Sequence, residues 1–168
     1  MPNTLVLTVA ASADDARRRT AAAPSFDTTF QISAGDYDAS NYDNISGLRF
    51  ANVTIPAFSV IVSATLALRA QTPFGTGWLT RLRGEAADNP PAFTDEVNFT
   101  ARAVGAQSVA WNPAAWVNGT SYDSPDITAI IQEIIDRAGW ASGNALVIFW
   151  DDNQGAGFQA QKLLQADS

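Results

Sequence analysis

The side chains that could carry chemistry in this chain of 168 residues are carboxylates and aromatic rings, because it contains no histidine and no cysteine. Imidazole bases, cysteine nucleophiles, thiolate zinc ligands and disulfides are therefore excluded. Aspartates gather at Asp36, Asp38 and Asp43, in a stretch of turn-forming residues and tyrosine. Carboxylate oxygens in such loops are ligands for Ca²⁺, which makes this loop a candidate calcium site. The alternative interpretation is a solvated loop that binds no ion.

Glycoside hydrolysis needs only two carboxylates beside the scissile bond, so composition alone does not exclude it. The acidic residues of this chain, however, fall mostly in separate short turns. We therefore expect a protein without catalytic activity and without a cofactor, apart from the calcium that the aspartate loop could bind.

Aromatic side chains form a second candidate site. Trp111 and Trp116 flank a short loop, and Tyr122 follows it. An exposed aromatic face can pack on the apolar face of a sugar, so these three residues are candidate glycan-binding residues. The alternative is that the rings cover the open end of a β-sandwich and belong to its core.

Three consecutive arginines, Arg17, Arg18 and Arg19, are the only basic cluster in the chain. They fall in a polar, alanine-rich connection that we expect to be a loop. Either the arginines belong to a solvated loop or form salt bridges with Asp14 and Asp15, or they contact an acidic partner subunit.

The charge balance bears on the choice of partner. The chain has 10 Lys and Arg against 17 Asp and Glu, a net charge of −7, which argues against a protein that binds nucleic acid directly. Only 16% of the residues are charged, whereas roughly 25% is usual in soluble domains. A surface so poor in charge is either a plain exterior of Ser, Thr, Asn, Gln and Ala or a surface that is buried against other copies or partners, since interfaces of that kind are depleted in charge.

Apolar residues near the N-terminus, from 5 to 13, faintly resemble a signal peptide. The preceding residues carry no Lys or Arg, and Thr8 interrupts the apolar run, so we interpret residues 5–9 as a first strand with Leu5, Leu7 and Val9 on one face. No stretch approaches the roughly 18 apolar residues that a membrane span needs, and we expect no membrane contact.

Alternating apolar and polar residues, separated by turn formers, predict a chain made mainly of short strands. In the stretch 60–70 the inward face should carry Val62, Ala64, Leu66 and Leu68. The predicted strands cover residues 5–9, 28–32, 47–53, 60–70, 78–84, 97–104, 108–111 and 145–150, of which the last is uniformly apolar and should be buried on both faces.

One segment has helical periodicity. The isoleucines at 127, 130, 131, 134 and 135 form a single stripe, which predicts a helix over about 125–138. Ser124 suits the N-cap, Pro125 the first helical position and Gly139 a left-handed stop. We therefore predict an all-β, jelly-roll β-sandwich with one α-helix packed on it, in a single domain over 1–168.

Two stretches of this chain resemble the DNRLRE-type jelly-roll domains. Gly47-Leu48-Arg49-Phe50 followed by Ile55-Pro56, and then Ser63-Ala64-Thr65-Leu66-Ala67-Leu68, is similar to their central motif. Trp111, residues 124–127, and the stretch from Trp140 to Leu146 resemble the second half of that family. The chain departs from the family after Trp150, where residues 151–168 are weakly patterned, so we expect an irregular closing strand or an edge that another chain completes.

Domains of this family occur in extracellular bacterial proteins, some of which bind polysaccharides, and in phage virions. The resemblance implies a scaffold rather than one activity. Together with the low charge, it leads us to expect a non-enzymatic bacteriophage virion protein. The expected role is a capsid decoration, or cement, protein that sits as a homotrimer on the major capsid protein at the capsid exterior. The alternative is an extracellular carbohydrate-binding module or a tail adhesin that uses Trp111, Trp116 and Tyr122.

Overall fold

Ten strands and two short α-helices make up the fold in the computed structural model, which describes residues 3–20, 25–28, 31–36, 43–71, 79–112, 115–153 and 164–167. The elements within these ranges are a 3-10 turn at Ser12–Asp14, β1 (Asp15–Arg19), β2 (Ser25–Asp27), β3 (Ile32–Asp36), β4 (Asp43–Phe50), β5 (Ala67–Ala70), β6 (Thr80–Glu85), α1 (Glu96–Thr100), β7 (Val104–Trp111), β8 (Ser121–Asp123), α2 (Thr128–Ile135), β9 (Leu146–Asp152) and β10 (Leu164–Asp167).

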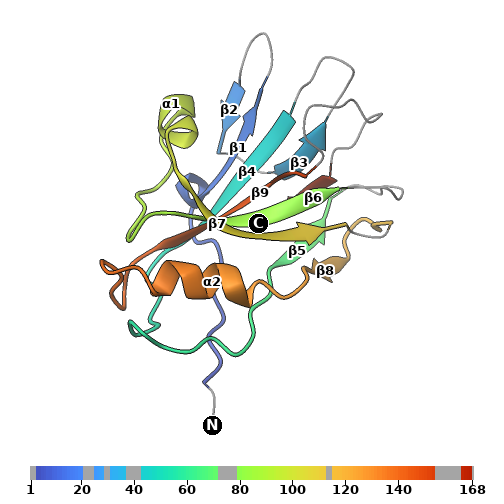
Figure 1. The fold of residues 1–168 in the computed structure, drawn as a ribbon. Coiled ribbons are helices and arrows are strands. Elements are labelled where there is room, and N and C mark those ends of the chain that lie inside the picture. Colours follow the sequence, from blue (N-terminus) through green and yellow to red (C-terminus); the bar gives the residue numbers. More distant parts are fainter. Residues whose placement is uncertain are drawn as a thin grey trace.

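The strands form two antiparallel sheets that share a core. The first sheet has the order β2-β1-β4-β9-β6-β7, and the second has the order β3-β10-β5-β8. Strand β3 joins them, because Gly35 and Asp36 pair with β4 whereas Ile32 to Ala34 pair with β10. In Figure 1 the strands fan across the molecule, with α2 below them and α1 at the upper left. The predicted all-β sandwich with a helix packed on it is confirmed.

Strand β9 is buried on both faces, as its uninterrupted apolar sequence predicts. Leu146, Ile148 and Trp150 face the main core between the sheets and α2, whereas Val147 and Phe149 face a second, smaller core. Consecutive side chains of a strand point to opposite faces, so a run of apolar residues requires cover on both sides.

Aromatic rings from the loop after β6 and from α1 supply the cover on the outer face of the first sheet. Phe93 and Phe99 pack there, with ring centroids 5.5 Å apart, and Phe99 meets Phe149 edge-to-face at 5.6 Å. Gly47 of β4 makes room for them, because a Cβ at this position would lie 2.5 Å from the Phe93 ring. The glycine of the Gly47-Leu48-Arg49-Phe50 motif is thus a packing requirement of the second core.

Helix α2 closes one side of the main core with its isoleucine stripe. Ile130, Ile134 and Ile135 are almost fully buried, and Gly84 of β6 lets the helix approach, since a Cβ there would lie 2.9 Å from Ile134 Cδ1. The pairing of β6 with β7 is irregular between Arg83 and Glu85. At that irregularity, the amides of residues 106 and 107 donate to the two carboxylate oxygens of Glu133, at 2.8 and 3.0 Å.

The start of α2 differs from the predicted cap. The helix begins at Thr128 rather than Pro125 and ends at Ile135, and Gly139 is absent from the described residues with positive φ. Ser124 instead accepts a hydrogen bond from the Leu66 amide, 2.9 Å away. Asp126 provides the first-turn acceptor, because its carboxylate receives the Thr128 amide at 2.8 Å, together with the Thr128 hydroxyl.

Replacing Asp126 by alanine should therefore lower the free energy of unfolding in a pH-dependent way. Hydrogen bonds from the Thr128 side chain and backbone, and then from the Ala64 amide, hold the pKa of Asp126 below its ordinary value. Stability from a lowered pKa is present above the ordinary value and is lost as pH falls through the folded-state pKa. The difference between wild type and Asp126→Ala, measured by urea unfolding, should be clear near neutral pH and disappear in acid.

The control for this effect is Asp136→Asn, at the other end of α2. Asp136 accepts the Gln132 side chain at 2.8 Å, and asparagine keeps that acceptor. The substitution removes a negative charge from the carbonyl end of the helix dipole, so stability should be unchanged or slightly raised. Equal losses in the two variants, or a loss at Asp126 that does not depend on pH, would contradict the capping role.

The predicted strand over 97–104 is wrong in its first half, where α1 forms instead. The Asp95 carboxylate caps this helix by accepting the Asn98 amide at 2.8 Å. Only Phe99 of the helix is buried, and Val97 is 79% exposed. The local cap therefore overrides the alternating pattern, and β7 begins only at Val104.

Three other expectations are also corrected. Residues 5–9 are not a strand, although Leu7 and Val9 pack against the main core. In the stretch 60–70, only Ala67–Ala70 is a strand, and Val62 is 72% exposed rather than inward. In residues 151–168, β10 lies between β3 and β5, so this chain fills that place in the second sheet itself.

Candidate functional site

The candidate glycan-binding rings belong to the main core. Trp111 and Trp116 are only 4% and 2% exposed. The ring of Trp116 stacks on that of Tyr122 at 5.1 Å between centroids and lies 5.7 Å from Trp111 and 6.0 Å from Trp150. Of the two interpretations of these residues, core packing therefore holds at both tryptophans, because their faces are covered by one another and by the core.

Hydrogen bonds hold this aromatic stack in place. The Trp150 indole donates to the Thr80 hydroxyl at 2.9 Å, and that hydroxyl donates to the Trp111 carbonyl at 2.6 Å. The half-buried Tyr122 accepts the Val117 amide at its hydroxyl, 2.9 Å away. The Thr80 hydroxyl thus links β9 to the end of β7, and the Tyr122 hydroxyl links β8 to the loop that precedes it.

The candidate calcium loop is described only at its two ends. Asp36 and Asp43 are register partners where β3 pairs with β4, so their backbones lie opposite one another. Asp38 lies outside the described residues. Among the residues that the structure does describe, no group of three or more acidic side chains is arranged to hold a metal ion.

The arginine cluster lies in strand β1 rather than in a loop. Arg17 pairs with Asp27 of the neighbouring β2 at 3.2 Å, and Arg18 pairs with Glu96 of α1 at 3.3 Å. Arg19 lies opposite Asn44 of β4. Arg17 and Arg18 thus pair with acidic residues that the fold brings close from β2 and α1, and Asp14 pairs with Arg49.

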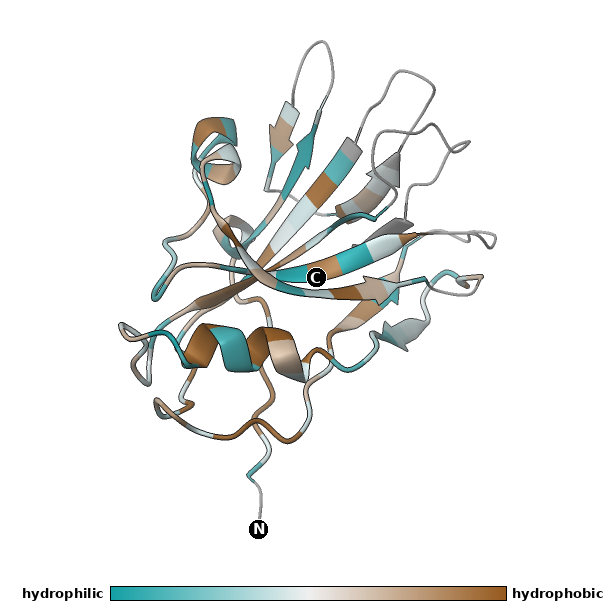
Figure 2. Cartoon of the chain, viewed as in Figure 1, coloured by the Kyte–Doolittle hydropathy of each residue, from teal (hydrophilic) through white to brown (hydrophobic). Residues whose placement is uncertain are grey.

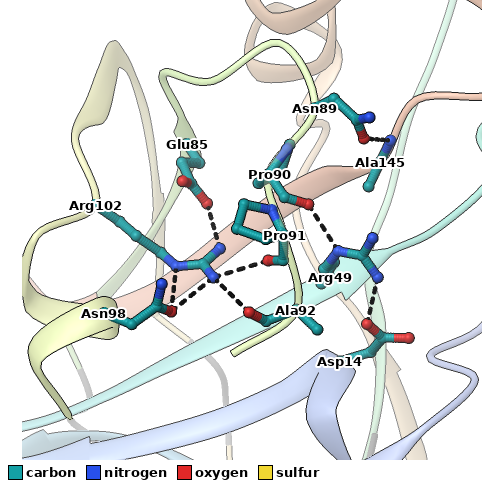
Figure 3. Close-up of polar contacts among 10 residues, drawn as sticks. All are labelled: Asp14, Arg49, Glu85, Asn89, Pro90, Pro91, Ala92, Asn98, Arg102 and Ala145. Carbon is teal, nitrogen blue, oxygen red and sulfur yellow. Dashed lines mark hydrogen bonds and ion pairs between the residues drawn. The ribbon is translucent and has the colours of Figure 1, made fainter. Parts of the chain in front are cut away.

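Arg102 is the centre of a buried polar network that sequence reasoning missed (Figure 3). Its guanidinium donates to the Glu85 carboxylate at 2.9 Å and to the Asn98 side chain at 2.9 Å. It also donates to the backbone carbonyls of Pro91 and Ala92, at 2.8 and 3.0 Å. The side chains of Arg102 and Glu85 are only 4% and 6% exposed. Burial raises the pKa of Glu85 above its ordinary value, against the opposing hydrogen bond and charge of Arg102.

Further contacts fasten the loop between β6 and α1 to the first sheet (Figure 3). Arg49 donates to the Pro90 carbonyl at 2.8 Å and pairs with Asp14. The Asn89 side chain accepts the Ala145 amide at 2.8 Å. Arginine suits these positions, because one guanidinium offers five donors to several carbonyl and carboxylate oxygens.

The other ion pairs also hold the fold. Arg81 and Arg83 of β6 both pair with Asp151 of β9, which is 3% exposed, and Arg137 pairs with Asp88 at 2.6 Å. At least seven arginines therefore pair with carboxylates of this chain within the described residues. These seven guanidinium groups stabilise the fold.

A small hollow near the network lies between the end of β6 and α2. It is lined by Glu85, Ala86, Gly105, Glu133, Ile134 and Arg137, and its volume is about 20 Å³. That is room for about one water molecule, so the hollow cannot hold a sugar or a cofactor.

Two segments carry exposed hydrophobic side chains that sequence reasoning missed, residues 5–6 and 58–62, and we call the two segments together the apolar end. It comprises Leu5, Val6, Phe58, Val60 and Val62, which are 43%, 82%, 80%, 82% and 72% exposed. In Figure 1 the segment that connects β4 to β5 runs below α2, at the same end of the molecule as the N-terminus. Figure 2 shows a largely hydrophobic ribbon along this segment. The run of β-branched residues from Val60 to Val62 was the available signal.

Comparison with protein-family models and with curated proteins finds no match to this chain. Within the described residues, no helix has the length and apolar character needed to cross a membrane.

Proposed function

We propose that this chain is a non-enzymatic structural protein of a bacteriophage virion, a capsid decoration protein that sits as a homo-oligomer, most simply a trimer, on the major capsid protein at the capsid exterior. The observation that carries the proposal is how the chain uses its reactive groups. Seven arginines form ion pairs within the fold. The candidate sugar-binding rings of Trp111 and Trp116 are packed in the core. The chain is poor in charge, and its described surface includes an apolar end.

Such a surface suits a protein that works by contact. A decoration protein has to bring a rigid shape to the junctions between capsid subunits, where additional buried area resists the pressure of packaged DNA. The network around Arg102 and the two cores supply the rigidity, because they tie both sheets, α1 and the loop before it into one block.

The alternative role, a carbohydrate-binding module or tail adhesin, has less support. Trp111 and Trp116 would have to leave the core to offer a face to a glycan. Removing two large aromatic rings from a core lowers the free energy of unfolding by several kcal/mol. The binding free energy of a weak sugar contact is smaller than this loss.

The test of the proposed function is deletion followed by add-back, in the phage that encodes the chain. Particles that lack the protein should assemble but release their DNA at a lower temperature than wild-type particles. Purified protein added to them should bind and restore the higher release temperature. If deletion leaves the release temperature unchanged and the purified protein does not bind the particles, the decoration role is wrong.

A further inference from the structure

Strand β7 is a long edge of the first sheet. Among the described residues its only strand partner is β6, and it stands at the end of the strand order. The terminal strands β2 and β8 are three residues long and each contains an aspartate, features that discourage the addition of another strand. Strand β7 has eight residues, none of them charged and none a proline. An edge of this kind is a template for a strand of another molecule unless the fold protects it.

A β-bulge interrupts this edge at residues 105–107. The register pairs Glu85 with Val104 and Arg83 with Ser108, so a single residue of β6 faces these three residues of β7. A bulge bends its strand and leaves the extra residues outside the regular ladder. A neighbouring strand therefore cannot pair continuously along β7 while the bulge is in place.

Glu133 of α2, the helix beside β7 in Figure 1, holds the bulge in this shape. Its two carboxylate oxygens accept the amides of Ala106 and Gln107, at 2.8 and 3.0 Å. Consecutive amides of a regular strand point to opposite edges, so one carboxylate binds both only where the strand is bulged. Gly105 suits this arrangement, because a Cβ at its position would overlap the Glu133 carboxylate. The two amides are thus engaged within the chain.

Beyond the bulge, the backbone of β7 has outward-facing groups at two residues. The Thr80 hydroxyl donates to the Trp111 carbonyl, so the backbone of Trp111 faces β6, and that of Val109 faces the same way because directions alternate along a strand. The backbone groups of Ser108 and Ala110 consequently face away from β6, and their side chains are exposed. A strand that added here would pair over this short stretch only, unless the bulge straightened.

We propose that Glu133 acts as a clamp that keeps β7 bulged and so prevents strands of other molecules from adding to this edge of the sheet. Without the carboxylate, the amides of Ala106 and Gln107 lose their acceptor, and the edge available for pairing lengthens from Ser108 toward Val104. The proposal does not rest on the virion role. Protection of this kind matters most where many copies of one chain lie close together, as they would on a capsid.

Replacing Glu133 tests the clamp. Glu133→Gln keeps one acceptor oxygen, and Glu133→Ala keeps none. Light scattering should show assemblies larger than any that the wild-type chain forms, growing with time and concentration, and faster for the alanine variant than for the glutamine variant. In these assemblies the amides of Ser108 and Ala110 should exchange with deuterium about tenfold more slowly than in the wild-type chain, because they gain hydrogen bonds.

Two further variants separate loss of the clamp from loss of charge and from misfolding. Asp136→Asn removes the same single charge from the same helix and keeps its own acceptor, so it should scatter light as the wild type does. Ala110→Lys, added to Glu133→Ala, should return the scattering to the wild-type level, because a charged side chain on an edge opposes strand addition. A chain that aggregated because it was unfolded would not be rescued by one lysine at this edge.

The clamp is rejected if both Glu133 variants fold, by circular dichroism, and scatter no more light than the wild type. It is equally rejected if their assemblies leave the amides of Ser108 and Ala110 unprotected, or persist after Ala110→Lys. If Glu133→Ala does not fold, Glu133→Gln alone decides by the same measurements. All of these measurements use the purified chain, so their outcome is independent of the deletion experiment that tests the virion role.

Discussion

Arg102→Met should lower the free energy of unfolding by about 3–5 kcal/mol, because it leaves a buried carboxylate without its cation. Glu85 is 6% exposed, and the Arg102 guanidinium 2.9 Å away is the cation with which it pairs. The substitution also removes the donors that hold the carbonyls of Pro91 and Ala92. Urea unfolding followed by circular dichroism measures the loss. An effect below about 1 kcal/mol, typical of exposed ion pairs, would contradict the role of Arg102 as the centre of the network.

A second substitution at Glu85 separates the charge effect from the loss of packing. Glu85→Gln added to Arg102→Met removes the unpaired charge, so the double variant should be more stable than Arg102→Met alone. The pH dependence should agree. Without Arg102 to oppose desolvation, the pKa of Glu85 rises further above its ordinary value. A raised pKa means that protonation of the carboxylate favours the folded state, so the deficit of Arg102→Met should shrink as the pH falls through that raised pKa.

Trp116→Ala should also lower the free energy of unfolding by about 3–5 kcal/mol, because it leaves a large cavity in the core. The ring is 2% exposed and contacts the rings of Trp111, Tyr122 and Trp150. Trp116→Phe, which keeps a ring in the stack, should lose less. Circular dichroism is the suitable probe, since the substitution alters tryptophan fluorescence directly.

Val117→Ala is the control next in sequence. Val117 is 62% exposed, and its replacement should change stability by less than about 0.5 kcal/mol. If Trp116→Ala is as stable as the wild-type protein, the ring is not part of the core. Trp116 would then again be a candidate glycan-binding residue.

The elements that could be predicted from the sequence are those whose periodicity has one structural solution. The isoleucine stripe of α2 fits a helix and nothing else, and the apolar run of β9 fits a strand covered on both faces. Both were predicted correctly in type, although α2 is shorter than expected. Its start is set by the Asp126 carboxylate rather than by Ser124, which bonds across to Leu66 instead.

Elsewhere the pattern had two solutions, and contacts distant in the sequence chose between them. The alternation over 97–104 predicts a strand, yet the cap at Asp95 and the docking of Phe99 on Phe149 favour a helix. In Val60-Ile61-Val62 either face could be buried. Gln132 of α2 binds the Ile61 amide and settles that the isoleucine faces inward.

The candidate site was harder to predict than the fold, because residue type does not show where a side chain lies. The aromatic residues near the β7–β8 connection suit both sugar binding and core packing, and only their mutual stacking decides the matter. The partners of the arginines are similarly distant, since Arg49 meets Asp14 and Arg18 meets Glu96 across 35 and 78 positions. Exposure of the apolar end follows from the same long-range packing.

Quantitative mass spectrometry of purified virions tests the central claim, that the chain is a structural component of the capsid, most directly. The peptides of this chain should be found at hundreds of copies per particle, in a simple ratio to the major capsid protein, as repeated sites on a symmetric shell require. A handful of copies per particle would place the protein in the tail, and its absence from purified particles would contradict the virion role altogether.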